Sequence, residues 1–415
     1  FALFALGEFV TYETEKPQPR AVLVGVPLDD EEDSLTELGQ LAKTLGFAVV
    51  DQLVQRRRSL SGPYVLGEGK LEELKTRCQE DVEAVIFDCE LTPSQVANLQ
   101  TACGVEVLDR TGVIVEIFSR HARTREARLQ VEIARLKYLA PRVRKAGRGP
   151  TARADKGGET ALELDRRRIR DRIAELKKEL EAIAGEEAQG RERRAEQRCV
   201  ALVGYTNAGK SSLMRALTGS QVLVEDKLFA TLDTTVRTLQ PETVPKILVS
   251  DTVGFIRKLP HDLVASFRST LEEARNAWLL LFVVDASDPD FRAQLQVTRE
   301  VLDELGAQDI ESRLVLNKID RLDSTDALRQ EFPDGWFVSA KDPESVACLR
   351  ALIVGCFESG MVEEEIFVPY ALSRVVGQLR SQVNVLGERH TDEGTFVMVR
   401  AEQGRLAGLR EMAAG

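Results

Sequence analysis

The fold is decided by CVALVGYTNAGKSSLMRAL, residues 199–217. Residues 199–203 form an apolar run of strand length, residues 204–211 match the pattern GxxxxGK[ST], and residues 212–217 have helical character. A strand, a tight loop and a helix in this order aim backbone N–H groups and a helix N-terminus at phosphate oxygens. The stretch therefore predicts an α/β domain that binds a nucleoside triphosphate, but it does not say which base.

The residue types in this loop suit a triphosphate and Mg²⁺. Gly204 and Gly209 let the backbone turn tightly, and we expect Lys210 to bridge the β- and γ-phosphates while the Ser211 hydroxyl binds the metal. Asn207 is a candidate holder of K⁺, although a hydrogen bond that stabilises the loop explains it equally well. The other loop residues expected to line the nucleotide are Tyr205, Thr206, Ala208 and Ser212.

A second apolar run, KILVS at 246–250, leads into DTVG at 251–254. We expect the Asp251 carboxylate to hold Mg²⁺ through a water molecule and the Gly254 N–H to contact the γ-phosphate. Alone, this short pattern would equally fit a helix cap or a turn. The residues between them in the predicted site are Thr252 and Val253.

Phe255 follows this motif, where Ras-like enzymes present a Gln that orients the attacking water. A phenylalanine side chain can neither donate nor accept a hydrogen bond. The water must then be positioned by backbone groups, another side chain, a monovalent cation or a partner. We therefore predict slow intrinsic turnover.

The choice of base is predicted by RLVL at 313–316, a strand that runs into NKID at 317–320. The Asp320 carboxylate can accept both N1–H and the exocyclic amine of guanine, whereas adenine would leave it buried and unpaired at a cost of kilocalories. Ser339, Ala340 and Lys341 follow another short strand and would supply a backbone N–H to guanine O6. The predicted ligand is GTP or GDP, with Asn317, Lys318 and Ile319 completing the base site.

A polar stretch between the first two motifs, FATLDTT at 229–235, is the candidate first switch over the γ-phosphate. Thr231 is the expected second protein ligand to Mg²⁺, with Thr234 and Thr235 as alternatives. Together with Lys210 and Gly254, Thr231 completes the expected catalytic set. The switch residues placed in the nucleotide site are Phe229, Ala230, Thr231, Leu232 and Asp233.

With 415 residues the chain is too long to fold around a single hydrophobic core, so several α/β parts are expected. Residues 1–110 alternate strand and helix patterns and predict a small α/β, nucleotide-binding-like subdomain. Residues 111–195 predict an antiparallel helical hairpin with a flexible tip at 141–158. Residues 196–361 predict the P-loop domain, with a mostly parallel sheet flanked by helices. Residues 362–415 predict a small α/β appendage, of which a strand, a helix and a strand are visible at 365–369, 371–379 and 395–399.

Charge is distributed unevenly along the chain, whose net charge is −11. Residues 119–172 hold 17 Lys and Arg against 7 Asp and Glu. This basic segment favours contact with RNA phosphates, although charge runs are commonly solvated faces of linkers. The residues expected to touch RNA are Arg142, Arg144, Lys145, Arg148, Arg153 and Lys156.

Composition points to a reducing, aqueous compartment. Six cysteines without a CxxC pair fit reduced thiols, and no apolar run is long enough for a membrane helix. The apolar residues 1–10 lack a basic leading segment and include Glu8, which argues against a secretory signal. We expect a cytoplasmic monomer without stable membrane insertion.

The motifs, taken together, resemble those of the HflX family of ribosome-associated GTPases, in the group that also contains Era, Obg and TrmE. The resemblance rests on GYTNAGKSSL from residue 204, LFATLDTT at 228–235, NKID at 317–320 and, most specifically, DTVGFIRKLPHDLVASFRSTLEE at 251–273. Outside this region the similar segments are GEGKLEEL at 67–74, ELTPSQVANL at 90–99, the run at 109–139 and GGETALELDRRRIRDRI at 157–173. Two positions differ from the usual family pattern, since Ala161 replaces a Gln and Thr234 replaces a Pro.

The resemblance implies a GTPase that binds the large ribosomal subunit in its GTP state, with the hairpin tip reaching rRNA. It further implies that the protein splits or rescues stalled ribosomes and hydrolyses GTP to GDP for release. Two alternatives remain at this point: a GTPase of the tRNA-modification type and a nucleotide-gated regulator of a membrane protease. The first would need a cofactor-binding domain and a reactive C-terminal Cys, which the sequence does not show.

Overall fold

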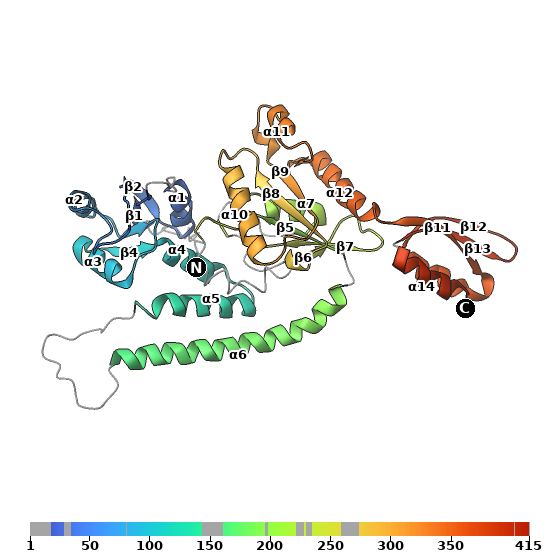
Figure 1. The fold of residues 1–415 in the computed structure, drawn as a ribbon, viewed down its shortest axis with the longest axis horizontal. Helices are drawn as coiled ribbons and strands as arrows, with labels where there is room; N and C mark the ends of the chain where they lie inside the picture. Colours follow the sequence, from blue (N-terminus) through green and yellow to red (C-terminus); the bar gives the residue numbers. More distant parts are fainter. Residues whose placement is uncertain are drawn as a thin grey trace, which may run out of the picture. The chain divides into compact units, whose positions relative to one another are not determined.

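The chain forms two compact units, Phe1–Ile117 and Phe118–Gly415 (Figure 1). A computed structural model describes residues 18–28, 35–79, 81–142, 161–195, 198–220, 228–229, 235–258, 274–401 and 403–414.

The first unit contains a four-stranded parallel sheet in the order β2-β1-β3-β4. Its strands are β1 (Arg20–Gly25), β2 (Ala48–Val54), β3 (Ala84–Phe87) and β4 (Glu106–Asp109), and its helices are α1 (Leu35–Thr44), α2 (Glu68–Arg77) and α3 (Pro93–Cys103). Helix α3 starts at a capping box formed by Thr92 and Gln95 and ends at Gly104 in the left-handed conformation. The alternating strand and helix pattern of the sequence thus produces the expected parallel α/β sheet.

Arg110 begins helix α4 (Arg110–His121) and is 2% exposed. Its guanidinium donates to the Asp88 carboxylate at 2.6 Å and also forms an ion pair with Glu37. Two carboxylates compensate for the burial of one cation, as a buried charge requires. This ion-pair cluster ties helix α1, the end of β3 and the start of α4 together.

Helices α5 (Arg125–Leu139) and α6 (Ala161–Ala195) pair as an antiparallel hairpin, as predicted. Arg125 contacts Glu179, and Glu132 contacts Arg172. The residue numbers thus rise along α5 while those of their partners fall along α6, which shows that the two helices are antiparallel. The apolar seam between them is narrow, and its buried side chains are Leu129, Ile133 and Leu176. Helix α4 ends at His121 and α5 starts after Thr124, whose hydroxyl accepts a hydrogen bond from the Ala127 N–H.

The predicted tip at 141–158 lies outside the described residues except for its first two positions. Arg142 is described: its guanidinium lies 3.6 Å from the centroid of the Tyr138 ring and donates to the Tyr138 carbonyl. The other predicted RNA contacts, Arg144, Lys145, Arg148, Arg153 and Lys156, fall outside the described residues.

A six-stranded sheet in the order β10-β9-β8-β5-β7-β6 forms the centre of the second unit. All neighbours pair in parallel except β6, which is antiparallel to β7. The strands are β5 (Arg198–Gly204), β6 (Thr235–Thr238), β7 (Ile247–Asp251), β8 (Leu279–Asp285), β9 (Ser312–Asn317) and β10 (Trp336–Phe337). The described helices beside it are α7 (Lys210–Thr218), α10 (Phe291–Glu304), α11 (Asp326–Glu331) and α12 (Pro343–Glu358), with a 3₁₀ turn at Ile319–Arg321.

This sheet has a large apolar core, because β5 and β8 are buried along almost their whole length. Side chains of α7 and α12, including Leu213, Leu217, Leu349 and Ile353, pack into the same cluster as the strands. The fold is therefore the predicted mostly parallel sheet flanked by helices.

A three-stranded antiparallel sheet ends the chain, in the order β11-β13-β12. It comprises β11 (Val362–Pro369), β12 (Asn384–His390) and β13 (Gly394–Ala401), with a 3₁₀ turn at Tyr370–Leu372, α13 (Ser373–Gln382) and α14 (Gln403–Ala414). Side chains of both helices share its apolar core. The sequence indicated β11, α13 and β13 but not β12 or α14. Strand β12 (NVLGERH) lacks an apolar alternation, and the described core-facing residues of α14 are only three, Leu406, Leu409 and Ala413.

Within the described ranges, no helix combines the length and the apolar character needed to cross a membrane. The longest described helix, α6, is 35 residues long and rich in Arg, Lys and Glu.

Candidate nucleotide-binding site

The sequence-predicted motifs gather at one edge of the six-stranded sheet. Strands β5, β7 and β9 end at Gly204, Asp251 and Asn317, and Ser339 follows the end of β10. Because these strands are parallel, their carboxyl ends share one edge, which is where α/β sheets bind ligands.

The two loop glycines are required by close approach of neighbouring elements. A Cβ atom built on Gly204 would lie 2.2 Å from the Val283 carbonyl oxygen, and one on Gly209 would lie 2.2 Å from the Asn317 Nδ2 atom. Gly209 also has φ of +93°, which disfavours other residues. The sequence explained both glycines by the tight turn alone, and the structure adds steric contact with β8 and with the NKID segment.

Lys210 begins helix α7 and is 6% exposed. Its ammonium donates to the carbonyl oxygens of Gly204 at 2.9 Å and Tyr205 at 2.8 Å. Burial lowers the pKa of Lys210 to about 8, and the nearby Asp251 carboxylate opposes that shift. The amine therefore lies inside the loop, bonded to the loop's own carbonyl groups.

The two predicted metal ligands that the structure describes lie together. The Ser211 hydroxyl donates to the Asp251 carboxylate at 2.7 Å, and Asp251 is fully buried. A hydroxyl and a carboxylate are the hard oxygen donors that Mg²⁺ prefers, and Mg²⁺ usually takes its remaining ligands from phosphates and water. The residues present therefore fit this metal. Thr235, one of the alternative ligands, pairs with Asp251 across β6 and β7.

The segment after Asp251 packs directly on the phosphate loop. The Thr206 N–H donates to the Phe255 carbonyl at 2.8 Å, and the Phe255 N–H donates to the Gly204 carbonyl at 3.1 Å. The Tyr205 hydroxyl accepts from the Arg257 N–H at 2.6 Å. Gly254 is held so close that a Cβ atom on it would lie 2.9 Å from Thr206. The following residues, 259–273, lie outside the described residues.

The predicted base site is connected by its own hydrogen bonds. Asn317 donates to the Ala208 carbonyl at 2.9 Å and accepts from the Ala340 N–H at 3.2 Å. The Ser339 hydroxyl donates to the Asp320 carboxylate at 2.7 Å. This hydrogen bond is the main reason that the pKa of Asp320 is lowered, and the ammonium of Lys341 contributes further. The carboxylate is therefore ionised and can only accept, as reading guanine requires.

Lys318 has a structural partner that the sequence motifs missed. Its ammonium donates to the Asp285 carboxylate and to the Asn207 carbonyl, both at 2.7 Å. Asp285 is the last residue of β8, and all the other residues of this strand are apolar. A carboxylate at the end of a buried apolar strand is the signal that could have identified it. The contact joins the base segment to the phosphate loop.

Part of the first switch is outside the described residues, namely Ala230, Thr231, Leu232, Asp233 and Thr234. Phe229 is described and is 2% exposed, with φ of +58°. Its ring packs edge-on against the Phe118 ring of α4, with 4.5 Å between centroids. The assignment of Thr231 as a metal ligand stays a prediction.

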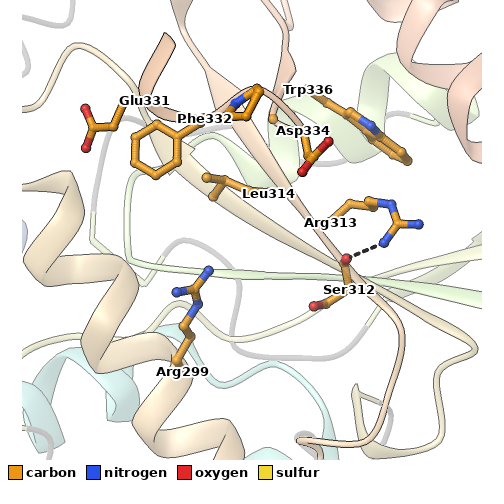
Figure 2. Close-up of a pocket in the computed structure, with 10 residues that line it drawn as sticks. Arg299, Ser312, Arg313, Leu314, Glu331, Phe332, Asp334 and Trp336 are labelled. Atoms are coloured by element: carbon orange, nitrogen blue, oxygen red, sulfur yellow. Dashed lines mark hydrogen bonds between the residues drawn. The ribbon is translucent and has the colours of Figure 1, made fainter. Parts of the chain in front are cut away.

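A cavity of about 770 Å³ lies away from these motifs (Figure 2). Ser312 and Trp336, which line it, begin strands β9 and β10, whereas the predicted site lies where the strands end. Figure 2 shows Leu314 beside the ring of Phe332. The charged groups at its rim include Arg313 and Glu331, which pair with neighbours outside the cavity, Glu311 and Arg292. Size alone therefore does not identify the site, and the converging polar groups of the motifs do.

Three family models together match most of the chain. The models described as GTP-binding GTPase N-terminal, GTP-binding GTPase Middle Region and 50S ribosome-binding GTPase match residues 32–119, 121–194 and 199–318.

Two of the curated relatives match nearly end to end, and a third matches about three quarters of its length. A protein named GTPase HflX from Gluconacetobacter diazotrophicus is 53% identical, with 97% of this chain and 99% of the relative covered. GTPase HflX from Caldanaerobacter subterraneus is 40% identical over 94% and 92%, and that of Escherichia coli is 41% identical over 73% and 74%.

Among solved structures, a complex of SsGBP with GDP is 27% identical and covers 82% of this chain and 98% of its own, with a TM-score of 0.47.

Proposed function

Because the chain belongs to the HflX family of GTPases, we propose that it binds the large ribosomal subunit in a GTP-dependent way and splits or rescues stalled ribosomes. Hydrolysis of GTP to GDP would then release it. The chain is a GTP hydrolase built on a P-loop domain. The partner, the splitting step and the roles of individual residues are the proposal.

At the nucleotide, the base segment would read guanine through Asp320, and Asn317 would hold that segment against the phosphate loop. Lys210 would leave its two carbonyl partners and donate to the phosphates, where burial strengthens the attraction. Mg²⁺, when bound, would neutralise charge between the β- and γ-phosphates. Ser211, Asp251 through a water molecule, and Thr231 are the residues that would hold it.

The link between nucleotide and ribosome is proposed to be the packing of Gly254 and Phe255 on the phosphate loop. Phe255 hydrogen-bonds to the loop backbone through its N–H and its carbonyl group, and Gly254 lies in close contact with Thr206 of the same loop. A γ-phosphate would draw the Gly254 N–H and reorganise the segment beyond Phe255, while the two Phe255 backbone bonds to the loop would remain. GTP and GDP states would therefore differ in the surface offered to the subunit.

Binding to the ribosome is supported by one observation above others: a basic helical hairpin in an acidic chain. Residues 119–172 carry 17 Lys and Arg against 7 Asp and Glu, although the net charge of the chain is −11. The seam between α5 and α6 uses few apolar side chains, so most of the α6 surface stays exposed. The basic excess lies in residues 119–172, since α6 as a whole carries 10 Lys and Arg against 9 Asp and Glu. A basic segment of this kind suits contact with RNA phosphates. We place this activity in the cytoplasm, with a monomer as the acting form.

Pelleting with ribosomal subunits tests this proposal. The protein should pellet with large subunits in a GTP analogue and not in GDP, and equal binding in both states would contradict it. Replacing Arg142, Arg144, Lys145 and Arg148 by Glu should abolish pelleting while GTP binding stays unchanged.

A matched control reverses four exposed cations elsewhere, by Glu at Arg215, Lys246, Arg374 and Arg405. This control should pellet like the parent. If both sets lose binding equally, net charge and not the hairpin is responsible. Incubating intact ribosomes with the protein and GTP, then separating subunits on a gradient, tests the splitting step.

Asn207 is the proposed site for K⁺. Its backbone is left-handed, with φ of 60°, and its side chain is exposed, with no hydrogen bond to another described residue. The amide oxygen is thus available to hold a cation beside the phosphates. GTP turnover should be faster in K⁺ than in Na⁺, and equal rates would remove this role.

A further inference from the structure

The residue that orients water in Ras-like enzymes is replaced here by a side chain that cannot do so. Phe255 is 2% exposed and carries no hydrogen-bonding group. Its backbone N–H and carbonyl are both used by the phosphate loop, through Gly204 and Thr206. Neither its side chain nor these two backbone groups are therefore left to hold the attacking water of the GTPase reaction.

Thr206 supplies a hydroxyl beside this position. The residue is 7% exposed, and its Oγ1 atom is buried without a hydrogen-bond partner among the described residues. A buried polar atom left unsatisfied costs about 1–3 kcal/mol, so such an atom usually bonds to water or to a ligand. In a phosphate loop the nucleotide and its water molecules are partners of the right chemistry.

The position of Thr206 relative to Lys210 and Gly254 identifies which part of the ligand it faces. A Cβ atom built on Gly254 would lie 2.9 Å from both Cα and Cγ2 of Thr206 and 3.2 Å from Nζ of Lys210. Lys210 and the N–H of this glycine are the two groups that approach the γ-phosphate in P-loop GTPases. The Thr206 side chain therefore lies at the γ-phosphate end of the pocket.

Rotation about χ1 brings the Thr206 hydroxyl to where its methyl group lies now. Threonine populates more than one χ1 rotamer, because its hydroxyl can find a hydrogen-bond partner in more than one of them. Such a rotation moves only side-chain atoms of Thr206 and leaves the loop backbone in place.

We propose that Thr206 positions the attacking water for GTP hydrolysis, its Oγ1 atom accepting a hydrogen bond from that water. The water oxygen forms a bond to the γ-phosphorus. The bond from this phosphorus to the bridging oxygen breaks, and its electron pair stays on GDP. The water proton passes to a γ-phosphate oxygen, giving inorganic phosphate, and Thr206 itself is unchanged. This inference rests on the GTPase activity and not on the ribosomal partner.

The test replaces the hydroxyl by a methyl group of the same shape. Thr206→Val should lower kcat by about 10- to 100-fold, the range of one hydrogen bond to a developing charge. Its Kd for GDP and for a non-hydrolysable GTP analogue should stay within about threefold, because the hydroxyl serves the water and not the nucleotide. Thr206→Ser, which keeps the hydroxyl, should recover at least about a third of the parental kcat.

A matched control is Thr298→Val on α10, which removes another buried threonine hydroxyl, one that donates to the Gln294 carbonyl at 2.9 Å. It should lower the melting temperature and leave kcat unchanged. Melting curves of all variants establish that each is folded. The proposal is overturned if Thr206→Val hydrolyses GTP at the parental rate, if its affinity for the analogue falls as much as its kcat, or if Thr206→Ser fails to recover activity.

Discussion

The two ends of the nucleotide pocket are prepared differently for their ligand. At the base end, Asn317 and Ser339 hold the segment and the reading carboxylate through hydrogen bonds that guanine need not break. At the phosphate end, Lys210 and Ser211 bond to protein groups that they would have to leave in order to contact the nucleotide and its metal as proposed. On the proposed assignment, base recognition is preformed, whereas phosphate binding exchanges one set of hydrogen bonds for another.

This contrast has an energetic consequence. A typical intramolecular hydrogen bond contributes about 0.5–1.5 kcal/mol net, so releasing the three bonds of Lys210 and Ser211 costs a few kcal/mol. Binding of the phosphates and Mg²⁺ must offset that cost. Binding of guanine requires almost no release of existing hydrogen bonds. Substitutions at the base end should therefore change which base binds, and those at the phosphate end should change how binding depends on the metal.

The largest effect is expected at the base end. Asp320→Asn replaces an acceptor of two N–H groups by an amide that also donates. The Kd for GDP should rise at least about 100-fold, and xanthosine diphosphate, which carries an oxygen in place of the guanine amine, should bind better than GDP. Calorimetric titration with both nucleotides measures this. The matched change Asp323→Asn, at an exposed neighbour, should have little effect. Unchanged base preference would contradict the assignment of Asp320.

The next largest effect is expected at the phosphate end, where nucleotide affinity should depend on Mg²⁺. Ser211→Ala removes the hydroxyl that now donates to Asp251 and is expected to bind Mg²⁺. Affinity for a GTP analogue should fall about 10- to 100-fold with Mg²⁺ present, since interactions with charged groups contribute about 1.5–3 kcal/mol. In a chelator the loss should be under about threefold. Fluorescence titration in both buffers decides, with Ser359→Ala at the exposed end of α12 as the control. Equal losses in the two buffers would mean that the Ser211 hydroxyl serves the fold and not the metal.

A smaller effect tests whether the base end is preformed. Ser339→Ala removes the hydrogen bond that holds the Asp320 carboxylate at 2.7 Å. The carboxylate must then be ordered on binding, so the Kd for GDP should rise about 3- to 10-fold without a change in base preference. Ser324→Ala, in an exposed turn nearby, is the control and should bind like the parent. An effect as large as that of Asp320→Asn would mean that Ser339 contacts the base directly.

The smallest effect concerns pH. The Ser339 hydroxyl lowers the pKa of Asp320, so in the parent this carboxylate stays ionised to lower pH than an ordinary Asp. Its contribution is present above its ordinary pKa and is lost only as the pH falls through the lowered value. The ratio of Kd values for Ser339→Ala and the parent cancels the titration of the nucleotide itself. That ratio should be constant from pH 8 to about pH 5.5 and should widen at lower pH, where the variant protonates first. A ratio that changes near neutral pH would contradict this pKa assignment.

Local chemistry made much of the fold predictable from sequence. The six-stranded sheet follows from short apolar runs such as LLLFVVD at 279–285, and the helical hairpin follows from the heptad-like spacing of apolar residues in α6. The phosphate loop is recognisable because few residue types allow the tight turn and the hydrogen-bond donors that a triphosphate requires. Strand β12 and helix α14 were missed because their residues are stabilised by contacts with β13 and β11 and not by a pattern of their own.

Contacts between distant segments were not predictable in the same way. Asp285 lies 33 residues before Lys318, and only the fold brings the pair to 2.7 Å. Likewise, nothing in the sequence of α4 indicates that Phe118 packs on Phe229, since both read as ordinary core residues. The ion pairs of Arg110 with Glu37 and Asp88 join three elements in the same manner. Tertiary packing determines these partners, and the sequence pattern of a single segment does not predict them.

The contact between Gly209 and Asn317 constrains any redesign of this protein. With only 2.2 Å from a built Cβ atom to the Asn317 amide, the phosphate loop and the base segment fit together as one interlocking part. Any side chain introduced at position 209 would collide with the Asn317 amide and displace the NKID segment. Redesigned phosphate loops for this protein must therefore keep glycine at that position or change Asn317 as well.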